Sequence, residues 1–454
     1  MTAVVLDQEE LARAISEGRV GAWLEGAGIN SVHLALFDSS GTLREKRLSP
    51  ASAARAFENG WSFIDAIQWW GPEDAVWRNG GSEHQPAAVD TGSGRPYPFE
   101  AGSVMFLAEF AGPMAELSPR HQLEKMVHRL AAAELTADVG WEFECIILES
   151  TPGETLDEAS TLRPAMSGNQ CWSSLTMANE APMIGGLVTT LEQGAIPVDH
   201  VCSELGPGCL ELALEHRPAG RSADNAALAR IFTKAYFSQH ALVATFMAQL
   251  SDQFPGLGGH PSLSLHSTLD AGPTLVHRDG TLSKVALAAI AGITTLLPEL
   301  LVMAAPNPNS YRRFGPGNWA PSTATWGVGN YSCALRVVAD HPKSTRLELR
   351  IPGADTNPHL CSAMMMGAAA WGIELGLDPP PPVQAPADGR EHQAGPRLPR
   401  TLIEAAELFS ESVAARTLFG STFVDHYVAS RMAEANACNR FVSAQERRRY
   451  MRHV

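Results

Sequence analysis

The chain has 454 residues, of which 45% are hydrophobic and 18% are charged. This balance is typical of a globular protein with a large core and excludes a disordered chain or one small module. The formal net charge of −15 at pH 7 argues against nucleic acid or an anionic membrane as a partner, because their phosphates would be repelled by such a surface.

The N-terminal part is expected to contain a helix followed by strands. Apolar residues recur at helical spacing over residues 6–24 and predict one short leading helix. Residues 31–37 and 42–48 are strand-like and flank a turn, which predicts a hairpin. Another apolar strand is expected over 104–110, and the glycine and proline that follow it indicate a domain boundary at residue 112.

From residue 113 to residue 454 we expect one larger domain in which helices alternate with strands. A helix over 121–136 leads into a strand over 141–148. Residues 378–396 include four consecutive prolines, which neither a helix nor an inner strand tolerates, so they are expected to form an exposed loop. The remainder, 401–453, is amphipathic and is predicted to be helical.

Two features of the sequence indicate the cellular compartment of the protein. The seven cysteines include no C-x-x-C pair and are expected to be reduced thiols, and the N-terminus lacks the pattern of a secretory signal. The apolar run 285–306 is long enough to cross a membrane, but Pro298 and Glu299 interrupt it. We therefore expect a buried helix that breaks at the proline, and a cytoplasmic protein.

Two pairs of acids are placed where their carboxylates can meet. Glu142 and Glu144 lie two apart in a predicted strand, so both side chains point to one face. A solvated acidic face of an edge strand would look the same. Glu204 and Glu211 flank a Gly-Pro-Gly turn, and such a hairpin brings them side by side.

Two further elements add an imidazole and a row of charges. A glycine-rich loop precedes His260, although a lone histidine is more often structural than a ligand. Arg346, Glu348 and Arg350 alternate along a strand and share one face, as they also would on a solvent-facing strand. Taken with the two acidic pairs, these elements supply five carboxylates and one imidazole, a set that suits Mg²⁺ or Mn²⁺ better than zinc.

The order of these motifs resembles that of the glutamine synthetase family over nearly the whole chain. The resemblance implies an α+β protein with an N-terminal β-grasp domain, 1–112, and a large catalytic domain, 113–454, whose antiparallel sheet lines a metal-binding funnel. The matching segments are residues 140–144, 204–211, 255–260, 309–313, 346–350 and 357–360.

The family's functional residues can be carried over position by position. The resemblance implies two or three Mg²⁺ or Mn²⁺ ions per site, held by two sets of side chains. One set is Glu144, Glu204 and Glu211, and the other is Glu142, His260 and Glu348. Glutamate would be bound by Gly256, Arg313 and Arg350, and ATP by Ser264, Arg336 and Arg346, with Arg313 and Arg336 as the catalytic arginines at the transferred phosphoryl group.

The reaction implied by this resemblance has two steps. The side-chain carboxylate of L-glutamate attacks the γ-phosphate of ATP to give γ-glutamyl phosphate, and a small amine then displaces phosphate. Active sites in the family are shared between subunits, which implies a dodecamer of two stacked hexameric rings.

The amine site departs from the family pattern. Trp319 stands where the family has a glutamate that closes over ammonium, and Trp69 and Trp70 of the adjacent subunit occupy a stretch without the expected acid. Trp172 and Tyr331 are expected to complete an apolar pocket. With these departures, the chain resembles the γ-glutamylanilide synthases of arylamine-degrading bacteria. An aniline is neutral near pH 7 and needs no acid to bind it.

The sequence leaves open other amine substrates and a non-catalytic role for the protein. The family also contains ligases for alkylamines, ethanolamine and polyamines, and a catalytically silent scaffold would lack the same flap glutamate. The substitutions at Ser262, Tyr331 and Gln249 leave the nucleotide contacts open as well.

Overall fold

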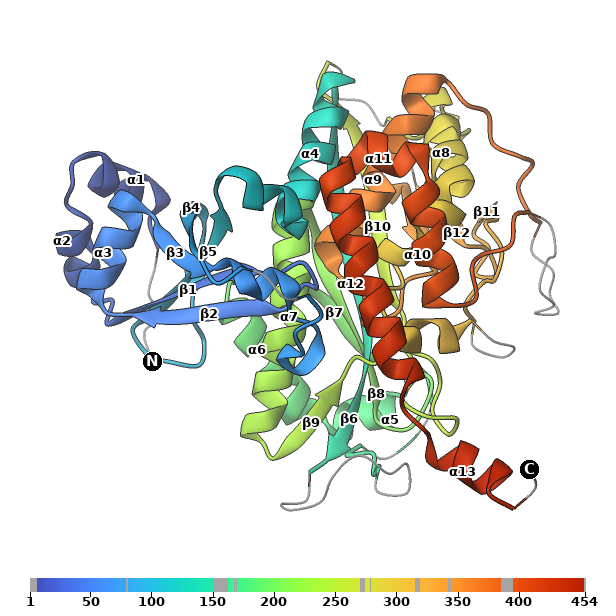
Figure 1. Cartoon of the computed structure of the whole chain (residues 1–454), viewed down its shortest axis with the longest axis horizontal. Coiled ribbons are helices and arrows are strands. Elements are labelled where there is room, and N and C mark those ends of the chain that lie inside the picture. Colours follow the sequence, from blue (N-terminus) through green and yellow to red (C-terminus); the bar gives the residue numbers. More distant parts are fainter. Residues whose placement is uncertain are drawn as a thin grey trace.

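The computed structural model consists of a smaller N-terminal lobe beside a larger body that contains the rest of the chain (Figure 1). The residues that it describes are 6–78, 81–150, 162–166, 168, 170–269, 274–277, 279–314, 319–341, 344–384 and 395–452.

The N-terminal lobe is built on a five-stranded sheet in the order β2-β1-β5-β4-β3. The predicted hairpin is confirmed as the antiparallel pair β1 and β2, and β5 runs parallel to β1. Apolar residues of this lobe form their own buried cluster around Leu34, Val104 and Phe106. The elements are α1 Gln8–Ser16, α2 Val20–Gly26, β1 Ser31–Phe37, β2 Leu43–Leu48, α3 Pro50–Asn59, β3 Trp61–Ile64, η1 Asp65–Trp69, η2 Pro72–Asp74, β4 His84–Pro96, β5 Ser103–Phe110 and η3 Gly112–Leu117.

The predicted single leading helix is wrong, because two helices, α1 and α2, occupy this stretch. Gly18 has a φ of +63°, a left-handed conformation that ends a right-handed helix. Leu11 and Leu24 are both buried, so each helix contributes to the apolar spacing that suggested a continuous helix.

The larger body is organised by an eight-stranded sheet in the order β11-β12-β13-β10-β6-β8-β7, with β9 paired to β6. Strand β6 lies between β8 and β10 and is antiparallel to both. Every pairing in this sheet is antiparallel except that of β11 with β12. The strands are β6 Leu135–Glu149, β7 Val198–Ser203, β8 Cys209–Pro218, β9 Leu242–Thr245, β10 Gly259–Ser267, β11 Trp326–Val328, β12 Leu335–Val338 and β13 Arg346–Leu349.

Helices cover this sheet and complete the core (Figure 1). The C-terminal helices α10 to α13 confirm the helical prediction for 401–453 as far as the described residues extend. The helices of the body are α4 Pro119–Ala132, α5 Ser174–Asn179, α6 Ala181–Gln193, α7 Ala219–Gln239, α8 Lys284–Leu300, η5 Leu301–Met303, η6 Pro308–Arg313, α9 Pro358–Leu375, α10 Leu402–Glu411, α11 Val413–Phe419, α12 Ser421–Asn439 and α13 Ala444–Tyr450.

The helix predicted over 121–136 is shorter at its C-terminal end than expected. Helix α4 ends at Ala132, and Glu134 has a φ of +60° that reverses the chain. Leu135 already belongs to β6, where it pairs with Ser267. The strand predicted over 141–148 is thus the second half of a longer one.

The apolar run 285–306 is a buried helix, as predicted, but it does not break at Pro298. Helix α8 continues through Pro298 to Leu300, because a proline in the last turn removes only one N–H···O bond from a well-packed helix. The segment Lys284–Met303 has the length and hydropathy of a membrane span, yet 72% of its most apolar window is buried inside the protein. Gly292 packs so closely on α9 that a Cβ there would lie 2.1 Å from the Ala368 carbonyl oxygen.

The proline-rich loop predicted over 378–396 is only partly described. Residues 378–384 are neither helix nor strand, and Val383 donates a 2.8 Å backbone hydrogen bond to Trp326. Residues 385–394 lie outside the described residues.

Candidate active site

A cavity of about 620 Å³ opens on one face of the large sheet. It gathers the carboxylates, the imidazole and the arginines singled out in the sequence, although they come from segments far apart in the chain. The residues that line it are Glu142, Glu144, Cys171, Trp172, Glu204, Leu205, Glu211, Pro255, Gly256, His260, Arg313, Trp319, Tyr331, Arg336, Arg346, Glu348 and Arg350.

The register of the strands explains why these side chains meet. Glu142 on β6 is the direct partner of His260 on β10, and Glu144 is the direct partner of Glu211 on β8. Residues two apart on a strand point to the same face, so Glu142 and Glu144 both enter the cavity. The alternation predicted for Arg346, Glu348 and Arg350 is confirmed, with Leu347 and Leu349 buried on the opposite face.

Glu142, His260 and Glu348 form a compact group. One ligand atom from each lies within 4.8 Å of the other two. Burial and the cations of Arg350 and Arg313 hold the pKa of His260 well below its usual range, so its ring is neutral and can offer a lone pair. Burial and the Glu348 charge raise the pKa of Glu142. A divalent cation bound here would offset the cost of placing these acids together.

Glu144, Glu204 and Glu211 line the same cavity in a looser arrangement. Among the described residues their carboxylates do not form a group as compact as the first. The Gly258 amide donates a 2.7 Å hydrogen bond to Glu144 Oε2, and the Cys171 thiol lies 3.3 Å from both oxygens of Glu204. Burial, Glu142 and Glu144 raise the pKa of Glu211 to about 7. This crowding of acids also fits a hard divalent cation.

Arginine side chains face the carboxylates across the cavity. Glu348 accepts a 2.7 Å hydrogen bond from Arg336 and a 2.6 Å hydrogen bond from Arg350. The Nε atoms of Arg313 and Arg336 are buried and have no hydrogen-bond partner among the described residues. Arg313 also approaches His260 Nε2 at 3.2 Å and donates to the Ile351 carbonyl at 2.9 Å. Such partly satisfied cations suit anionic groups, namely phosphates and carboxylates.

The loop before β10 brings backbone into the cavity. A Cβ at Gly256 would lie 2.8 Å from Arg313 Cγ, so only glycine fits there without a shift. Gln249 Nε2 donates to the carbonyls of Ser251 and Phe254 at 2.7 and 2.8 Å and fixes the start of this loop. This structural role of Gln249 was not anticipated from the sequence, where the residue stood out only as a departure in the nucleotide site.

Aromatic side chains border the cavity. Trp172 and Trp319 are 72% and 70% exposed, and both have positive φ, 54° and 50°. The backbone of Trp172 is held by a 2.7 Å hydrogen bond to Ser203. The Tyr331 ring stacks under Arg336, whose Cζ lies 3.9 Å from the ring centre. Two indoles are therefore presented to the cavity with most of their surface uncovered.

Three of the residues for which a binding role is predicted do not line this cavity within the chain. Ser264 points to a neighbouring depression on β10, where its hydroxyl lies 3.4 Å from the Thr345 carbonyl. Trp69 packs against His426 of α12, and Arg44 covers the ring of Trp70. A contribution of the two tryptophans to an adjacent subunit stays a prediction.

Known proteins resemble this chain over most of its length. A family model described as the glutamine synthetase catalytic domain matches residues 116–450. The chain is 31% identical to type-1 glutamine synthetase 2 of Dictyostelium discoideum over 436 residues, 92% of this chain and 83% of the relative. It is 32% identical to a gamma-glutamylethanolamide synthetase of Streptomyces coelicolor over 447 residues, 94% of each. It is 31% identical to a glutamate–isopropylamine ligase of a Pseudomonas species over 364 residues, 78% of each.

A solved structure shows the same fold. A GmaS–ADP complex superposes with a TM-score of 0.83 at 21% identity and covers 95% of this chain and 99% of its own. Since the family model spans more than half of the chain and two curated relatives exceed 30% identity over nearly all of it, the chain belongs to the glutamine synthetase family, whose members are ATP-dependent ligases that form a C–N bond between glutamate and an amine.

Proposed function

We propose that this enzyme joins the γ-carboxylate of L-glutamate to an apolar amine through γ-glutamyl phosphate, and that an aromatic, aniline-like amine is its preferred substrate. One observation carries the proposal. Trp172 and Trp319 border the same cavity as the carboxylates and arginines, and they are 72% and 70% exposed. Three curated relatives are named as ligases for isopropylamine, ethanolamine and putrescine, so amines other than ammonia are within the range of this family.

Two or three Mg²⁺ or Mn²⁺ ions would be held by the six predicted ligands. The compact group of Glu142, His260 and Glu348 supports one of these sites, and the crowded acids Glu144 and Glu211 support another. When bound, the ions neutralise the phosphates of ATP and the charge that develops during phosphoryl transfer.

The chain's own cations would position the two substrates. Arg350 is aimed into the cavity by its bonds to Glu348 and to the Tyr331 carbonyl, and it would clamp the glutamate α-carboxylate. Gly256 would admit the amino acid close to the backbone. Arg313 and Arg336 each have a buried Nε without a hydrogen-bond partner in the described part of the chain, and they would face the transferred phosphoryl group. Arg346 would bind ATP, and Ser264 would do so from the adjacent depression.

The uncovered indoles favour a neutral, apolar amine. An aniline arrives uncharged near pH 7, so no acid is needed to hold a cation or to convert it to the free amine before attack. The one N–H proton that is lost when the amide forms goes to the departing phosphate or to solvent. Burying its ring against Trp319 and Trp172 gains about 25 cal/mol for each Å² of apolar surface removed from water, whereas ammonia gains almost nothing. Tyr331 borders the cavity beside them, but its ring is already engaged by Arg336.

A small apolar alkylamine is the second candidate. The relative named as a glutamate–isopropylamine ligase favours it. A branched alkyl group would use the same indole surface, but alkylamines are cations near neutral pH and would need to lose a proton. A polyamine carries a further positive charge that these tryptophans do not neutralise.

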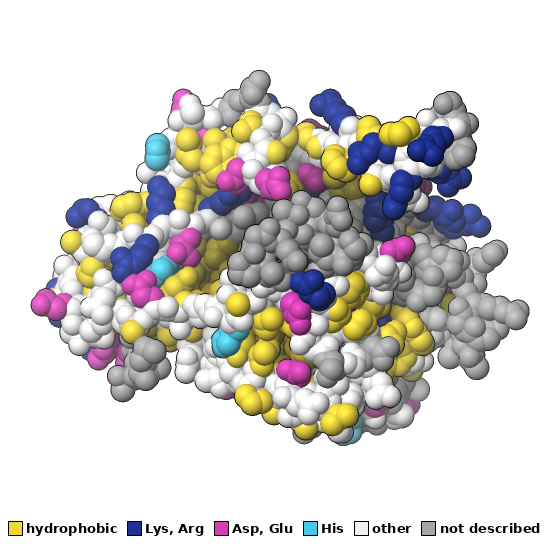
Figure 2. All heavy atoms as spheres, turned by 90° about the horizontal axis from the view of Figure 1, so that it is seen from below, with side chains coloured by type: hydrophobic (Ala, Val, Ile, Leu, Met, Phe, Trp, Pro, Cys, Tyr) yellow, Lys and Arg dark blue, Asp and Glu magenta, His cyan; other side chains and the backbone are white. Residues whose placement is uncertain are grey.

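The assembly, the domain division and the location of the enzyme are also part of this proposal. We expect a β-grasp domain over 1–112, a funnel-shaped site in the catalytic domain, two stacked hexameric rings with shared active sites, and a cytoplasmic enzyme. Helix α13 supports assembly, because it has no buried residue and projects from the body (Figure 1). Phe441 and Met451, which flank it, are exposed. Figure 2 shows apolar, acidic and basic side chains mixed over the lower face, with Lys and Arg gathered on the side where α13 lies.

The proposal is tested by incubating the enzyme with ATP, Mg²⁺, glutamate and one amine at a time. Phosphate release that depends on the amine, together with a mass spectrum of the γ-glutamyl amide, is the expected result. ATP hydrolysis without γ-glutamyl amide from any amine would contradict the proposed ligase activity. No ATP hydrolysis at all would favour a catalytically silent scaffold.

A further inference from the structure

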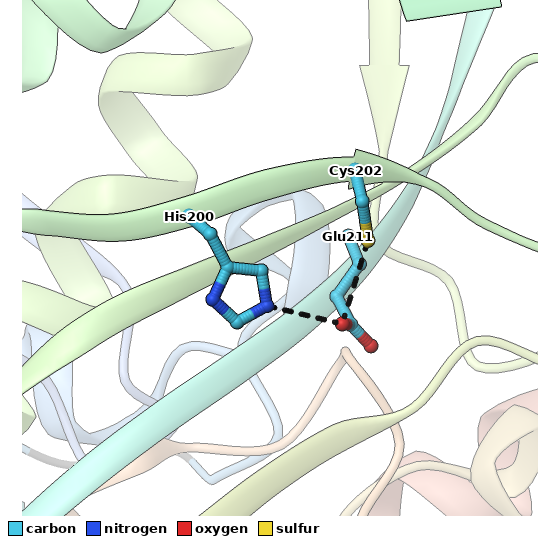
Figure 3. Close-up of side chains that lie close together, drawn as sticks. All are labelled: His200, Cys202 and Glu211. Atoms are coloured by element: carbon cyan, nitrogen blue, oxygen red, sulfur yellow. Dashed lines mark hydrogen bonds and ion pairs between the residues drawn. The ribbon is translucent and has the colours of Figure 1, made fainter. Parts of the chain in front are cut away.

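A second cluster of ligand-type side chains lies at the border of the cavity, and two of its three members, His200 and Cys202, have no role in the proposed ligase chemistry. His200 and Cys202 lie on the edge strand β7, two residues apart, and Glu211 is the direct partner of Cys202 on β8. Figure 3 shows the imidazole and the thiol both directed at the Glu211 carboxylate.

The distances in this cluster match the edges of a small coordination sphere. His200 Nε2 lies 3.7 Å from Glu211 Oε1, and Cys202 Sγ lies 3.7 Å from the same oxygen. One ligand atom from each of the three residues lies within 4.8 Å of the other two. In a tetrahedral site with Zn–N and Zn–O of about 2.0–2.1 Å and Zn–S of about 2.3 Å, ligand atoms are separated by roughly 3.4–3.6 Å. Small side-chain rotations would therefore bring the three ligand atoms to the separations found in a tetrahedral Zn²⁺ site.

The contacts of His200 orient its ring for metal binding. Its Nδ1 lies 2.9 Å from Asp199 Oδ2, so a proton on Nδ1 is held by the carboxylate and the lone pair of Nε2 faces Glu211. This carboxylate–histidine arrangement is the usual orientation of a metal-bound imidazole. His200 is exposed on the edge of the sheet, which gives an ion a path from solvent.

The donor set distinguishes this cluster from the carboxylate sites. A thiol and an imidazole are soft or intermediate ligands that favour Zn²⁺, whereas Mg²⁺ prefers oxygen alone. A cation held between His200, Cys202 and Glu211 would have one nitrogen, one sulfur and one oxygen ligand.

We propose that His200, Cys202 and Glu211 form a Zn²⁺ site with a fourth position open to water. On binding, Cys202 gives its thiol proton to solvent and a Zn–S bond forms, with no change of oxidation state. Because Glu211 is also a ligand of the catalytic metals in the proposed function, Zn²⁺ at this site withdraws it from them and inhibits the ligase. That last consequence rests on the proposed function, whereas the site itself does not.

Cobalt substitution tests the site without any assay of activity. The metal-depleted enzyme is titrated with Co²⁺, and the near-ultraviolet band of a thiolate–Co²⁺ bond is recorded together with the visible bands of tetrahedral Co²⁺. We expect both sets of bands in the wild type, and we expect both to disappear when Zn²⁺ displaces Co²⁺. Cys202→Ser should abolish the thiolate band, and His200→Asn should weaken Co²⁺ binding by about tenfold.

Two other cysteines provide controls. Cys438 lies 3.7 Å from Glu434 on the surface of α12, so Cys438→Ser should leave the band unchanged. Cys171 contacts Glu204 in the same cavity, and Cys171→Ser should also leave it unchanged. A wild type without the thiolate band, a band that survives Cys202→Ser, or one that is lost in Cys171→Ser would overturn the proposal.

Inhibition is measured separately. Zn²⁺ is titrated against Mg²⁺-dependent phosphate release, and Cys202→Ser should raise the Zn²⁺ concentration for half inhibition by about tenfold. An enzyme with the cobalt spectrum but without ligase activity would contradict the proposed function and keep the Zn²⁺ site. An active ligase without the cobalt spectrum would contradict only the Zn²⁺ site.

Discussion

Glu144 on β6 and Glu211 on β8 stand directly opposite each other in the antiparallel sheet. Like charges in this position are destabilising. Burial, Glu142 and Glu144 accordingly raise the pKa of Glu211 to about 7. A divalent cation bound between these carboxylates would offset their repulsion, which is the physical basis for the metal sites that we propose.

Metal binding should therefore stabilise the protein measurably. A ligand that binds only the folded state adds about 2.7 kcal/mol at one hundred times its Kd, so Mg²⁺ is expected to raise the Tm. Glu211→Gln removes both a repulsion and a ligand, so it should be more stable than the wild type in EDTA and gain less from Mg²⁺. Calorimetry with Glu192→Gln, an exposed residue of α6, as the control measures both effects. Equal gains in wild type and Glu211→Gln would show that Glu211 binds no metal.

Glutamate binding should depend on the shape of Arg350 as well as its charge. Its guanidinium bonds Glu348 and the Tyr331 carbonyl at the same time, an arrangement that an ammonium group cannot reproduce. Arg350→Lys is expected to raise the KM for glutamate by about tenfold or more, the equivalent of about 1.4 kcal/mol, with a smaller change in the KM for ATP. Steady-state kinetics measure both, and Arg47→Lys on the surface of the N-terminal lobe is the matched control. Equal effects on the two KM values would argue against a glutamate clamp.

Stability should fall with pH between about 4.5 and 7 because of Glu109. Burial, opposed by Arg120, raises the pKa of Glu109 to about 7. In this window the folded protein binds a proton that the unfolded chain has released, so the free energy of unfolding decreases as pH rises. Glu109→Gln should flatten this slope in denaturant titrations at several pH values, whereas Glu192→Gln should not. An unchanged slope would show that Glu109 ionises normally.

Trp319 should determine which amine is used. Trp319→Glu places a carboxylate where an aromatic amine would be buried, so kcat/KM for aniline is expected to fall by about tenfold or more. ATP and glutamate binding should survive. Trp319→Phe keeps an apolar ring and is the matched control, expected to retain the order of preference. If Trp319→Glu leaves that order unchanged, the indole does not contact the amine.

Assembly can be tested at the C-terminus. Removal of residues 441–454 deletes α13 and the exposed Phe441 and Met451 and leaves the buried part of α12 intact. The full chain is expected to have the mass of a dodecamer by light scattering, and the truncated chain that of a smaller species. A full-length monomer that is fully active would contradict shared active sites.

The local patterns of the site were predictable from the sequence. The alternation of Glu142 with Glu144, the hairpin that carries Glu211 and the strand that carries Glu348 follow from the period of two in a strand, and all of these residues line the cavity. The resemblance to the family indicated how the distant segments come together.

Features that depend on packing were not predictable in the same way. Helix α8 runs through Pro298 because its neighbours hold it, and α4 ends early because Leu135 pairs with Ser267. The proximity of His200 and Cys202 to Glu211 depends on the register of β7 against β8, past an irregularity between Val198 and His200. The alternation of His200 with Cys202 was visible in the sequence, but only the register of β7 against β8 shows that Glu211 lies opposite Cys202.

The most direct test of the central claim is kcat/KM of the wild-type enzyme for aniline, isopropylamine, ethanolamine, putrescine and ammonia, with ATP, Mg²⁺ and glutamate saturating. The exposed indoles of Trp172 and Trp319 at the border of the cavity predict the highest value for aniline, a lower one for isopropylamine and the lowest for ammonia and putrescine. A wild type that prefers ammonia or putrescine would contradict the account.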